Sequence, residues 1–310
     1  AKPEWIPGET ERDLTFSLAH FPLLEDHTFF HQAPDWPVME DRYPVVPMTA
    51  LIEHMKHEVE RAATGSVAVR LGRVRARKWM AVEPAITVSV RTQEKEPGVY
   101  DVTLGDYTEA SVSTASGYPE HSGERFVSRQ PAREFPLVVE DLYPQRWMFH
   151  GPAYQGIVRL DSLTDDSIVG WIEAGEAEGA LLDNAGQLLG LWVMCTQEKD
   201  RLAMPVQIQD IQLHGPHPAP GTLVECRVHI RQCGSRQVIA DIQCWVGDTC
   251  WAEIRGWEDW RFETDERLWP MLQFPDRHVL AESVESSLWK MDLRGRSSRG
   301  LEDLSRRFLG

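Results

Sequence analysis

The stretch LLDNAGQLLGLW, residues 181–192, decides the fold because it belongs to the second of two helical runs that share the same surroundings. We predict a helix over residues 180–198 and two short strands before it, at 157–163 and 168–172. Turn signals such as Pro218-Ala219-Pro220-Gly221 separate the strands expected after it. These strands lie at residues 206–213, 223–230, 238–245 and 250–257.

The first half of the chain repeats this order. A strand expected at residues 14–18 precedes a helix over residues 49–63, in which Leu51, Met55 and Val59 lie on one apolar face. Strands are expected after it at residues 67–82, 86–91, 99–104 and 110–116. The repetition predicts a duplicated α+β fold, in which two antiparallel sheets each wrap one long central helix.

We therefore divide the chain into three parts. Residues 1–135 form an N-terminal subdomain and residues 136–265 form a C-terminal subdomain. Residues 266–310 carry arginines among serines and glycines, and we interpret them as a C-terminal linker or tail with a short helix near residues 301–308.

Composition excludes several classes of function. An apolar content of 42% and a charged content of 26% are typical of a globular protein. The net charge of −16 disfavours nucleic acid and anionic membrane surfaces as partners, because both attract basic faces. No apolar run reaches the roughly 18 residues of a membrane helix, and no signal-peptide pattern is found, so we expect a cytoplasmic location.

The residues that most often bind metals form no convincing set in the sequence. The five cysteines contain no C-x-x-C pair, and we interpret them as free thiols. His54 and His57 lie near Glu58, but no third ligand follows at a convincing spacing, so we interpret both as solvated surface residues. No glycine-rich phosphate loop is present. We expect no metal and no cofactor in this domain.

His27 and Asp183 are the candidate catalytic residues, because they occupy equivalent places in the two halves. Imidazole titrates near neutral pH, so His27 suits the role of general base. A carboxyl group buried among apolar side chains has a raised pKa, so Asp183 suits the role of general acid. Gln187 is one helical turn further on and is expected to orient the carboxyl group. A base and an acid facing one tunnel are what elimination of water from a β-hydroxyacyl compound requires.

Four segments resemble the dehydratase domains of modular polyketide synthases, which have a double hot-dog fold. Leu24-Glu25-Asp26-His27 resembles the family segment that ends in the catalytic histidine, and Val46-Pro47-Met48-Thr49 resembles the start of its first helix. Gly151-Pro152-Ala153-Tyr154 resembles its Gly-Pro-x-Phe motif, and the run from Asp183 to Gln187 resembles its Asp-x-x-x-Gln/His motif. The resemblance extends from about residue 12 to residue 265.

The resemblance implies a hydro-lyase that removes water from a 3-hydroxyacyl chain and gives the 2,3-enoyl thioester. It implies that phosphopantetheine of an acyl carrier protein carries the substrate, and that neighbouring synthase domains are further partners. Whether the domain also forms a homodimer stays open. Gly151, Pro152 and Tyr154 would support the site. Backbone N–H groups at the helix start after Pro47 would polarise the thioester carbonyl.

Two departures from the family pattern are visible. The residue four positions after the histidine is His31, where the family usually has glycine, and the matching proline is Pro47, after an insertion. His150 precedes Gly151, where the family often has tyrosine. Two alternatives therefore stay open. One is a hot-dog thioesterase or double-bond isomerase, and the other is a degenerate dehydratase-like domain with a structural or docking role.

Two further predictions concern access to the site. An acidic carrier protein should meet either the arginine-rich tail or a local basic patch, which comprises Arg70, Arg73, Arg75, Arg77 and Lys78. The insertion between His27 and Pro47 is expected to form part of the tunnel wall or a lid, with Trp36 or Tyr43 against the acyl chain. A surface excursion is the alternative for that insertion.

Overall fold

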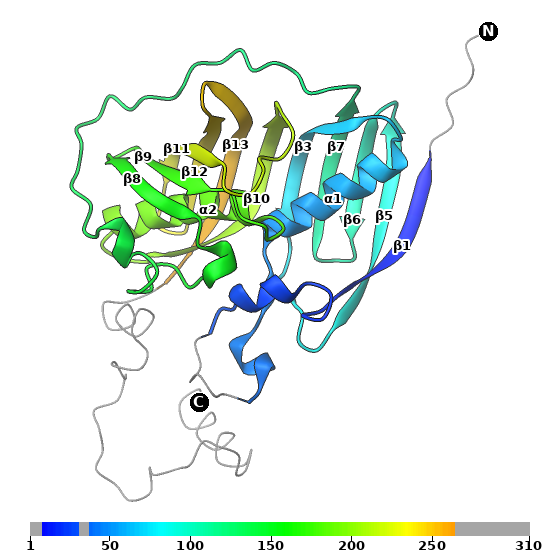
Figure 1. Ribbon diagram of the computed structural model, residues 1–310, viewed down its shortest axis with the longest axis horizontal. Helices are drawn as coiled ribbons and strands as arrows, with labels where there is room; N and C mark the ends of the chain where they lie inside the picture. The colour runs from blue at the N-terminus through cyan, green and yellow to red at the C-terminus, as the bar shows by residue number, and fades with distance from the viewer. Residues whose placement is uncertain (1–7, 31–36, 264–310) are drawn as a thin grey trace, which may run out of the picture.

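One sheet of eleven antiparallel strands dominates the computed structural model, which describes residues 8–30 and 37–263 (Figure 1). The strand order is β1-β5-β6-β7-β3-β10-β13-β12-β11-β9-β8. The first five strands in this order have the bounds Glu9–Phe16 (β1), Ile86–Glu96 (β5), Val99–Leu104 (β6), Thr108–Ala115 (β7) and Val67–Ala76 (β3). The other six are Leu202–Leu213 (β10), Thr249–Phe262 (β13), Gln237–Val246 (β12), Leu223–Cys233 (β11), Ser167–Glu173 (β9) and Ile157–Leu163 (β8).

The sheet is continuous because β3 pairs with β10, with Leu71 opposite Ile211 and Arg75 opposite Gln207. The α+β class with mostly antiparallel strands is confirmed, but the prediction of two separate sheets is wrong. The physical reason is that each half would otherwise end in an unpaired strand, and pairing β3 with β10 satisfies the backbone groups of both edges. A small second sheet joins β2 (Val45–Val46) to β4 (Met80–Ala81).

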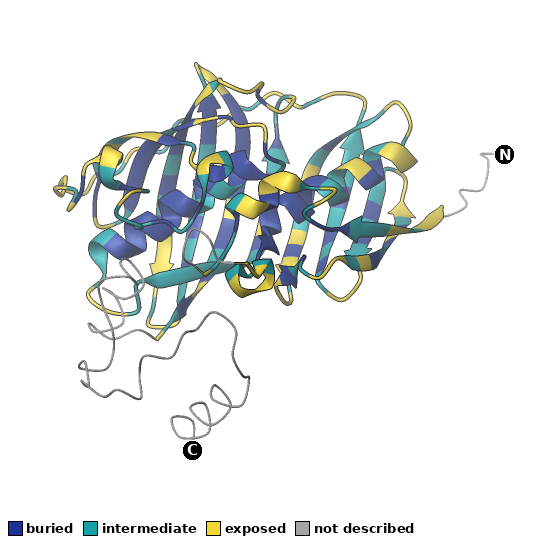
Figure 2. Cartoon of the chain, turned by 60° about the horizontal axis from the view of Figure 1, so that its bottom comes forward, coloured by how far each residue is buried: buried dark blue, intermediate teal, exposed yellow. Residues whose placement is uncertain are grey.

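Two long helices pack on this sheet, each against its own set of strands. Helix α1 (Met48–Ala62) contacts β3, β5, β6 and β7, whereas α2 (Ala180–Thr196) contacts β8 to β12. Helix α1 is amphipathic, as its spacing predicts, while α2 is buried on nearly every side. Figure 2 shows the strands with buried residues alternating with more exposed ones, the pattern of a sheet with one covered face.

Close contacts fix the positions of both helices. The indole of Trp257 lies against Gly186, where a Cβ atom would be 2.7 Å from Cζ2 of the ring, so α2 approaches β13 closely. At the start of α2, Gly179 has a φ of +76°, and a Cβ atom there would lie 2.6 Å from the Ala50 Cα atom. The amino-terminal turns of α1 and α2 therefore touch, and this contact brings residues of both halves together.

Within the described residues, the fold also contains four short 3-10 helices: η1 (Pro22–Asp26), η2 (Met39–Arg42), η3 (Val139–Asp141) and η4 (Pro152–Tyr154). All five cysteines are free, with Cys226, Cys244 and Cys250 buried and Cys233 exposed. In the part of the chain that the structure describes, no helix is long and apolar enough to cross a lipid bilayer. The predicted tail, residues 266–310, lies outside the described residues, and the division into subdomains stays a prediction.

Candidate active site

His27 follows η1 directly and is 5% exposed. Its Nδ1 atom lies 2.9 Å from the carbonyl oxygen of Val45, and the Val45 N–H donates to the His27 carbonyl at 3.1 Å. A carbonyl oxygen only accepts hydrogen bonds, so Nδ1 carries the hydrogen and Nε2 presents a lone pair. Burial lowers the pKa of His27 to about 4, which leaves the imidazole neutral at neutral pH. His27 is therefore held in the form that accepts a proton.

Asp183 lies in the first turn of α2 and faces His27. The Nε2 atom of His27 is 3.9 Å from Oδ1 of Asp183, and the aspartate side chain is 13% exposed. The prediction that these two distant residues come together is confirmed by this distance. Their roles as base and acid stay a prediction.

Gln187 holds Asp183 from one helical turn further on. Its Nε2 donates to Asp183 Oδ2 and to the carbonyl oxygen of Tyr154, both at 2.9 Å. Its Oε1 accepts a hydrogen bond of 3.1 Å from the Tyr143 hydroxyl. Both amide hydrogens have acceptors, so the orientation of the Gln187 side chain is determined by its neighbours.

His150 is a fourth polar residue in this cluster, and sequence reasoning noted it only as a departure from the family pattern. Its Nε2 lies 3.2 Å from Asp183 Oδ2, and its ring stacks on Phe149 with centroids 4.0 Å apart. Gln187 and His150 thus both contact Oδ2, while Oδ1 faces His27. A proton on the Asp183 carboxyl group would therefore be carried on Oδ1, toward His27.

The charge of Asp183 differs from the expectation. Burial acts to raise its pKa, but His150, His27 and Gln187 lower it, and the net direction is downward. The prediction that burial keeps this carboxyl protonated is wrong for the resting structure, because His150 and Gln187 stabilise the carboxylate. Burial thus favours the neutral imidazole of His27, while His150 and Gln187 favour the carboxylate form of Asp183.

Asp26 connects the His27 segment to the Gly151-Pro152 turn. The Gly151 N–H donates to the Asp26 carbonyl at 2.7 Å, and the Ala153 N–H donates to Asp26 Oδ2 at 2.8 Å. Pro152 opens η4, which ends at Tyr154; the buried Tyr154 ring lies 5.2 Å from the His27 ring. Gly151, Pro152 and Tyr154 therefore all belong to the scaffold of the site.

Two scaffold residues were missed in the sequence. The Tyr143 hydroxyl accepts from the Ile157 N–H at 3.1 Å, and Asn184 Oδ1 accepts from the Gly156 N–H at 2.8 Å. Burial raises the pKa of Tyr143 far above its usual range, so the hydroxyl keeps its hydrogen. The position of Asn184 beside Asp183 was the available signal, whereas nothing near Tyr143 pointed to α2.

Pro47 is the N-cap residue of α1 and comes two residues after Val45, whose carbonyl holds His27. Its own carbonyl accepts from the Ala50 and Leu51 N–H groups at 3.0 and 3.2 Å. The hydroxyl of Thr49, in the first turn of α1, is buried and has no hydrogen-bond partner within the described residues. A thioester carbonyl polarised by this helix start stays a prediction.

The predicted lid is only partly within the described residues, because Trp36 lies outside them. Tyr43 stacks on Phe29, with ring centroids 6.1 Å apart, and Phe29 in turn lies 6.2 Å from the His27 ring. Tyr43 thus belongs to an aromatic group beside the site, with Phe29 between it and His27. Its contact with an acyl chain stays a prediction.

Two clusters of histidine and acidic side chains contain possible metal ligands, although we expected no metal from the sequence. Ligand atoms of His27, His150 and Asp183 lie within 4.8 Å of one another, so these residues could hold an ion as well as move protons. His54 and His57 both face Glu178, at 3.3 and 3.6 Å. The interpretation of His54 as a solvated surface residue is wrong, since its side chain is 12% exposed and paired with that carboxylate.

No family model matches the chain, and no curated protein matches it in sequence. Solved structures do match it. The dehydratase domain of the CurF module of curacin polyketide synthase is 16% identical, with a TM-score of 0.61 over 83% of this chain and 94% of that one. The chain has the fold of polyketide synthase dehydratase domains.

Two further dehydratase-fold structures support this similarity. The dehydratase domain of PpsC from Mycobacterium tuberculosis, in complex with C12:1-CoA, is 15% identical, with a TM-score of 0.62 over 82% of this chain and 94% of that one. A trans-AT polyketide synthase dehydratase domain from Brevibacillus brevis is 16% identical, with a TM-score of 0.61 over the same shares. The family resemblance seen in four short motifs is thus confirmed at the level of the fold.

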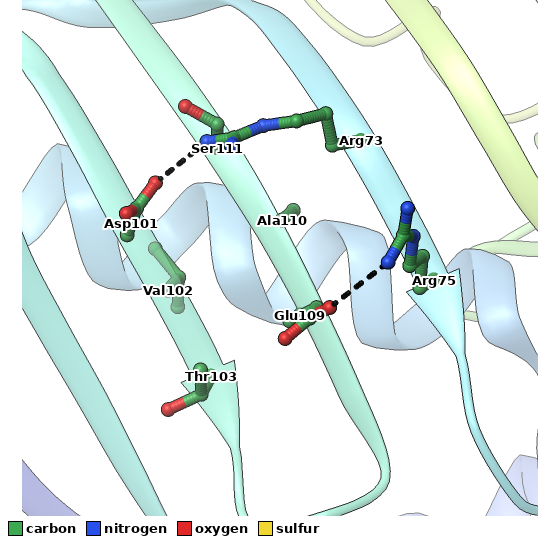
Figure 3. Close-up of a pocket in the computed structure, with 8 residues that line it drawn as sticks. All are labelled: Arg73, Arg75, Asp101, Val102, Thr103, Glu109, Ala110 and Ser111. Carbon is green, nitrogen blue, oxygen red and sulfur yellow. Dashed lines mark hydrogen bonds and ion pairs between the residues drawn. The ribbon is translucent and has the colours of Figure 1, made fainter.

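The basic patch predicted for docking is neutralised by neighbouring carboxylates. Arg70 pairs with Asp210, Arg73 with Asp101 at 3.1 Å, and Lys78 with Asp106 at 2.6 Å. Arg75 and Arg77 both pair with Glu109. Figure 3 shows Arg73 and Arg75 lining a hollow on the face of the sheet turned away from α1, together with Asp101 and Glu109. A patch of alternating charges attracts an acidic protein much less than the five cations alone suggested.

Proposed function

We propose that this chain is the dehydratase domain of a polyketide synthase, removing water from a 3-hydroxyacyl thioester to give the 2,3-enoyl thioester. The observation that supports it best is the pair of His27 Nε2 and Asp183 Oδ1, 3.9 Å apart, with Nδ1 of the same imidazole bonded to Val45. A neutral imidazole and a carboxyl group at this separation can reach two adjacent carbons of one bound substrate.

In the proposed reaction, Nε2 of His27 takes the proton from Cα of the substrate. The electron pair of that C–H bond forms the Cα–Cβ double bond, and the C–O bond at Cβ breaks. The leaving hydroxyl takes a proton from Oδ1 of Asp183 and departs as water. Return of the proton from His27 to Asp183 restores both groups. Because Asp183 is ionised at rest, the active form of the site must first gain one proton.

We further propose that an acyl carrier protein presents the substrate on its phosphopantetheine and that the domain acts beside other synthase domains. The fold similarity to polyketide synthase domains supports this setting, although the ion pairs of the basic patch leave it no large excess of positive charge. Tethering within a synthase would make strong docking unnecessary, because it raises the effective concentration of the carrier.

One observation favours a second candidate function. An ionised Asp183 beside a neutral His27 could activate water against the thioester carbonyl, as in a hot-dog thioesterase. A double-bond isomerase would use the same pair to move a proton. The degenerate, non-catalytic alternative is less favoured, because the base, the carboxylate and its orienting amide are all in place.

Product analysis separates these candidates. A 3-hydroxyacyl pantetheine thioester is incubated with the purified chain, and the products are identified by mass spectrometry. The dehydratase proposal expects the enoyl thioester, and expects its loss in His27→Ala and in Asp183→Asn while circular dichroism stays unchanged. Release of the free acid would support the thioesterase instead. No conversion in either direction, tested also with enoyl thioester and water, would overturn both enzymatic proposals.

A further inference from the structure

A second group of histidines and an acid lies outside the His27–Asp183 site. His121 belongs to the connection of residues 116–138 between β7 and η3, His214 directly follows β10, and Glu253 lies in β13. One ligand-capable atom of each residue lies within 4.8 Å of those of the other two. Figure 1 shows this connection arcing over the top of the molecule as drawn. The short distances between the ligand atoms show that three separate segments of the chain meet here.

His214 is held in the form that a metal requires. Its Nδ1 atom lies 3.0 Å from the carbonyl oxygen of Pro119, so Nδ1 carries the hydrogen and Nε2 presents a lone pair. That Nε2 is buried and has no hydrogen-bond partner within residues 8–30 and 37–263. A histidine that donates one ring nitrogen to a backbone carbonyl and leaves the other free has the arrangement typical of metal ligands.

His121 shows the same unsatisfied nitrogen. Its Nε2 is likewise buried without a hydrogen-bond partner in the described part of the chain. The ring is held in place by its neighbours, with centroids 4.9 Å from His214 and 5.2 Å from Trp245. Buried nitrogens without partners destabilise a fold and are few in native structures, so these two indicate a position where a bound group would be stabilising.

Glu253 supplies the negative charge. Its side chain is 18% exposed, and Arg255 Nη2 lies 3.3 Å from Oε2, so the other carboxylate oxygen is left for a cation. Zn²⁺ accepts both imidazole nitrogen and carboxylate oxygen as ligands, so two histidines and one glutamate suit it, and it commonly completes a tetrahedron with solvent. Gly123 lies beside His121, and a Cβ atom there would be 2.9 Å from Nε2 of His121.

We propose that His121, His214 and Glu253 form a structural Zn²⁺ site that ties the 116–138 connection to β10 and β13. Zinc–nitrogen bonds are about 2.0–2.1 Å long, so binding draws the three side chains inward from their present spacing. The ion satisfies both buried Nε2 atoms and closes two long loops of the chain. Because the ligands come from three segments far apart in the sequence, the site could not be predicted from the spacing of its residues.

The experiment uses the full chain, stripped of metal by a chelator and dialysis. Zn²⁺ is titrated against a chromophoric competitor, and Co²⁺ is added in parallel because its absorption spectrum reports tetrahedral coordination. We expect one equivalent of Zn²⁺ for the wild type. His121→Ala and His214→Ala should weaken binding by at least about tenfold and abolish the cobalt spectrum. Gly123→Ala keeps both imidazoles but crowds Nε2 of His121, so it should also weaken binding.

Two controls make the outcome specific. His20→Ala removes a histidine elsewhere on the molecule, and Asp183→Asn removes a ligand of the other histidine cluster; both should keep one equivalent of Zn²⁺. Zn²⁺ should also raise the Tm of the wild type and of both controls, but not that of His214→Ala. The proposal is overturned if the wild type binds no Zn²⁺, or if binding is lost in Asp183→Asn and kept in His214→Ala.

Discussion

The side chain of Asp26 occupies the space that a Cβ atom on Gly151 would need, because such an atom would lie 2.8 Å from Asp26 Cβ. The residue beside the candidate base thus packs directly on the turn that carries His150 and Tyr154. Two hydrogen bonds from that turn to Asp26 reinforce the contact. The His27 segment and the Gly151-Pro152 segment therefore form one unit, although they lie far apart in the sequence.

Gly151→Ala should disturb this unit. The added methyl group must push Asp26 away, and overpacking of this kind costs about 1–3 kcal/mol of unfolding free energy. We also expect a lower kcat, because the displacement reaches His27 and His150. Urea unfolding and steady-state kinetics check both effects. Gly117→Ala is the matched control, since a Cβ atom there meets nothing within 4 Å.

Gln187→Ala should slow the reaction without abolishing it. The variant removes one of the two groups that contact Asp183 Oδ2, and a hydrogen bond of this kind contributes on the order of 1 kcal/mol. That corresponds to a roughly fivefold lower kcat, against complete loss in Asp183→Asn. A loss in Gln187→Ala as complete as that of His27→Ala would show that the amide takes part in the chemistry.

The variant His150→Phe tests whether His150 orients the Asp183 carboxyl group and favours its ionised form. Phenylalanine keeps the stacking on Phe149 but removes the contact with Oδ2. Burial then acts on Asp183 with less opposition, so its pKa should rise and the alkaline limb of kcat/KM should move to higher pH. The pH profile is the measurement. A lower rate with an unmoved profile would indicate a purely structural role.

The pH dependence of the wild type follows from the same two groups. Dehydration by the proposed mechanism needs Asp183 protonated, and its pKa lies below the ordinary carboxyl value near 4, so kcat/KM should already fall as pH rises above about 4 and should keep falling through neutrality. It also needs His27 neutral, and the pKa of His27 is about 4, so activity should fall again only in strong acid. The optimum therefore lies on the acidic side of neutral pH. Thioester hydrolysis through the carboxylate would instead be flat across neutral pH.

Asp259 should make stability depend on pH. Burial raises the pKa of this residue to about 7, against the hydrogen bond that Trp257 donates to its carboxylate at 2.7 Å. The native state holds a proton that the unfolded chain has released above its ordinary pKa near 4, so stability falls as pH rises toward 7, by up to about 1.4 kcal/mol per pH unit. Asp259→Asn should flatten this slope. Urea unfolding at about pH 5 and about pH 8 measures it.

Local patterns predicted the elements well, because periodicity reflects which face is buried. The helix expected at residues 180–198 is α2 (Ala180–Thr196), and the one expected at 49–63 is α1 (Met48–Ala62). The strand expected at 67–82 instead ends at Ala76 and resumes at Met80. Pairing across the sheet could not be predicted, because any edge strand of one half could have met any edge strand of the other.

The acid–base pair could be proposed from the sequence, because its motifs are local and their order is informative. The charge of Asp183 could not, because it depends on His150 and Gln187, whose distances to the carboxylate exist only in the folded chain. The same is true of Tyr143, whose hydroxyl reaches α2 from a different segment. The candidate metal site of His121 and His214 could not be predicted from the sequence either, because only the folded chain shows that their Nε2 atoms lack hydrogen-bond partners.

The pairing of β3 with β10 also determines where the molecule can open. His27 and Asp183 come from opposite sides of that seam, and the backbone ladder between Leu71 and Ile211 resists any separation of the two sides. If an acyl thioester is the substrate, as we propose, we expect its chain to enter by displacing side chains that lie off the sheet, such as those of Phe29 and Tyr43. We then expect the mobility of those side chains to govern the rate of substrate entry, while the paired strands hold the base and the acid at a constant distance.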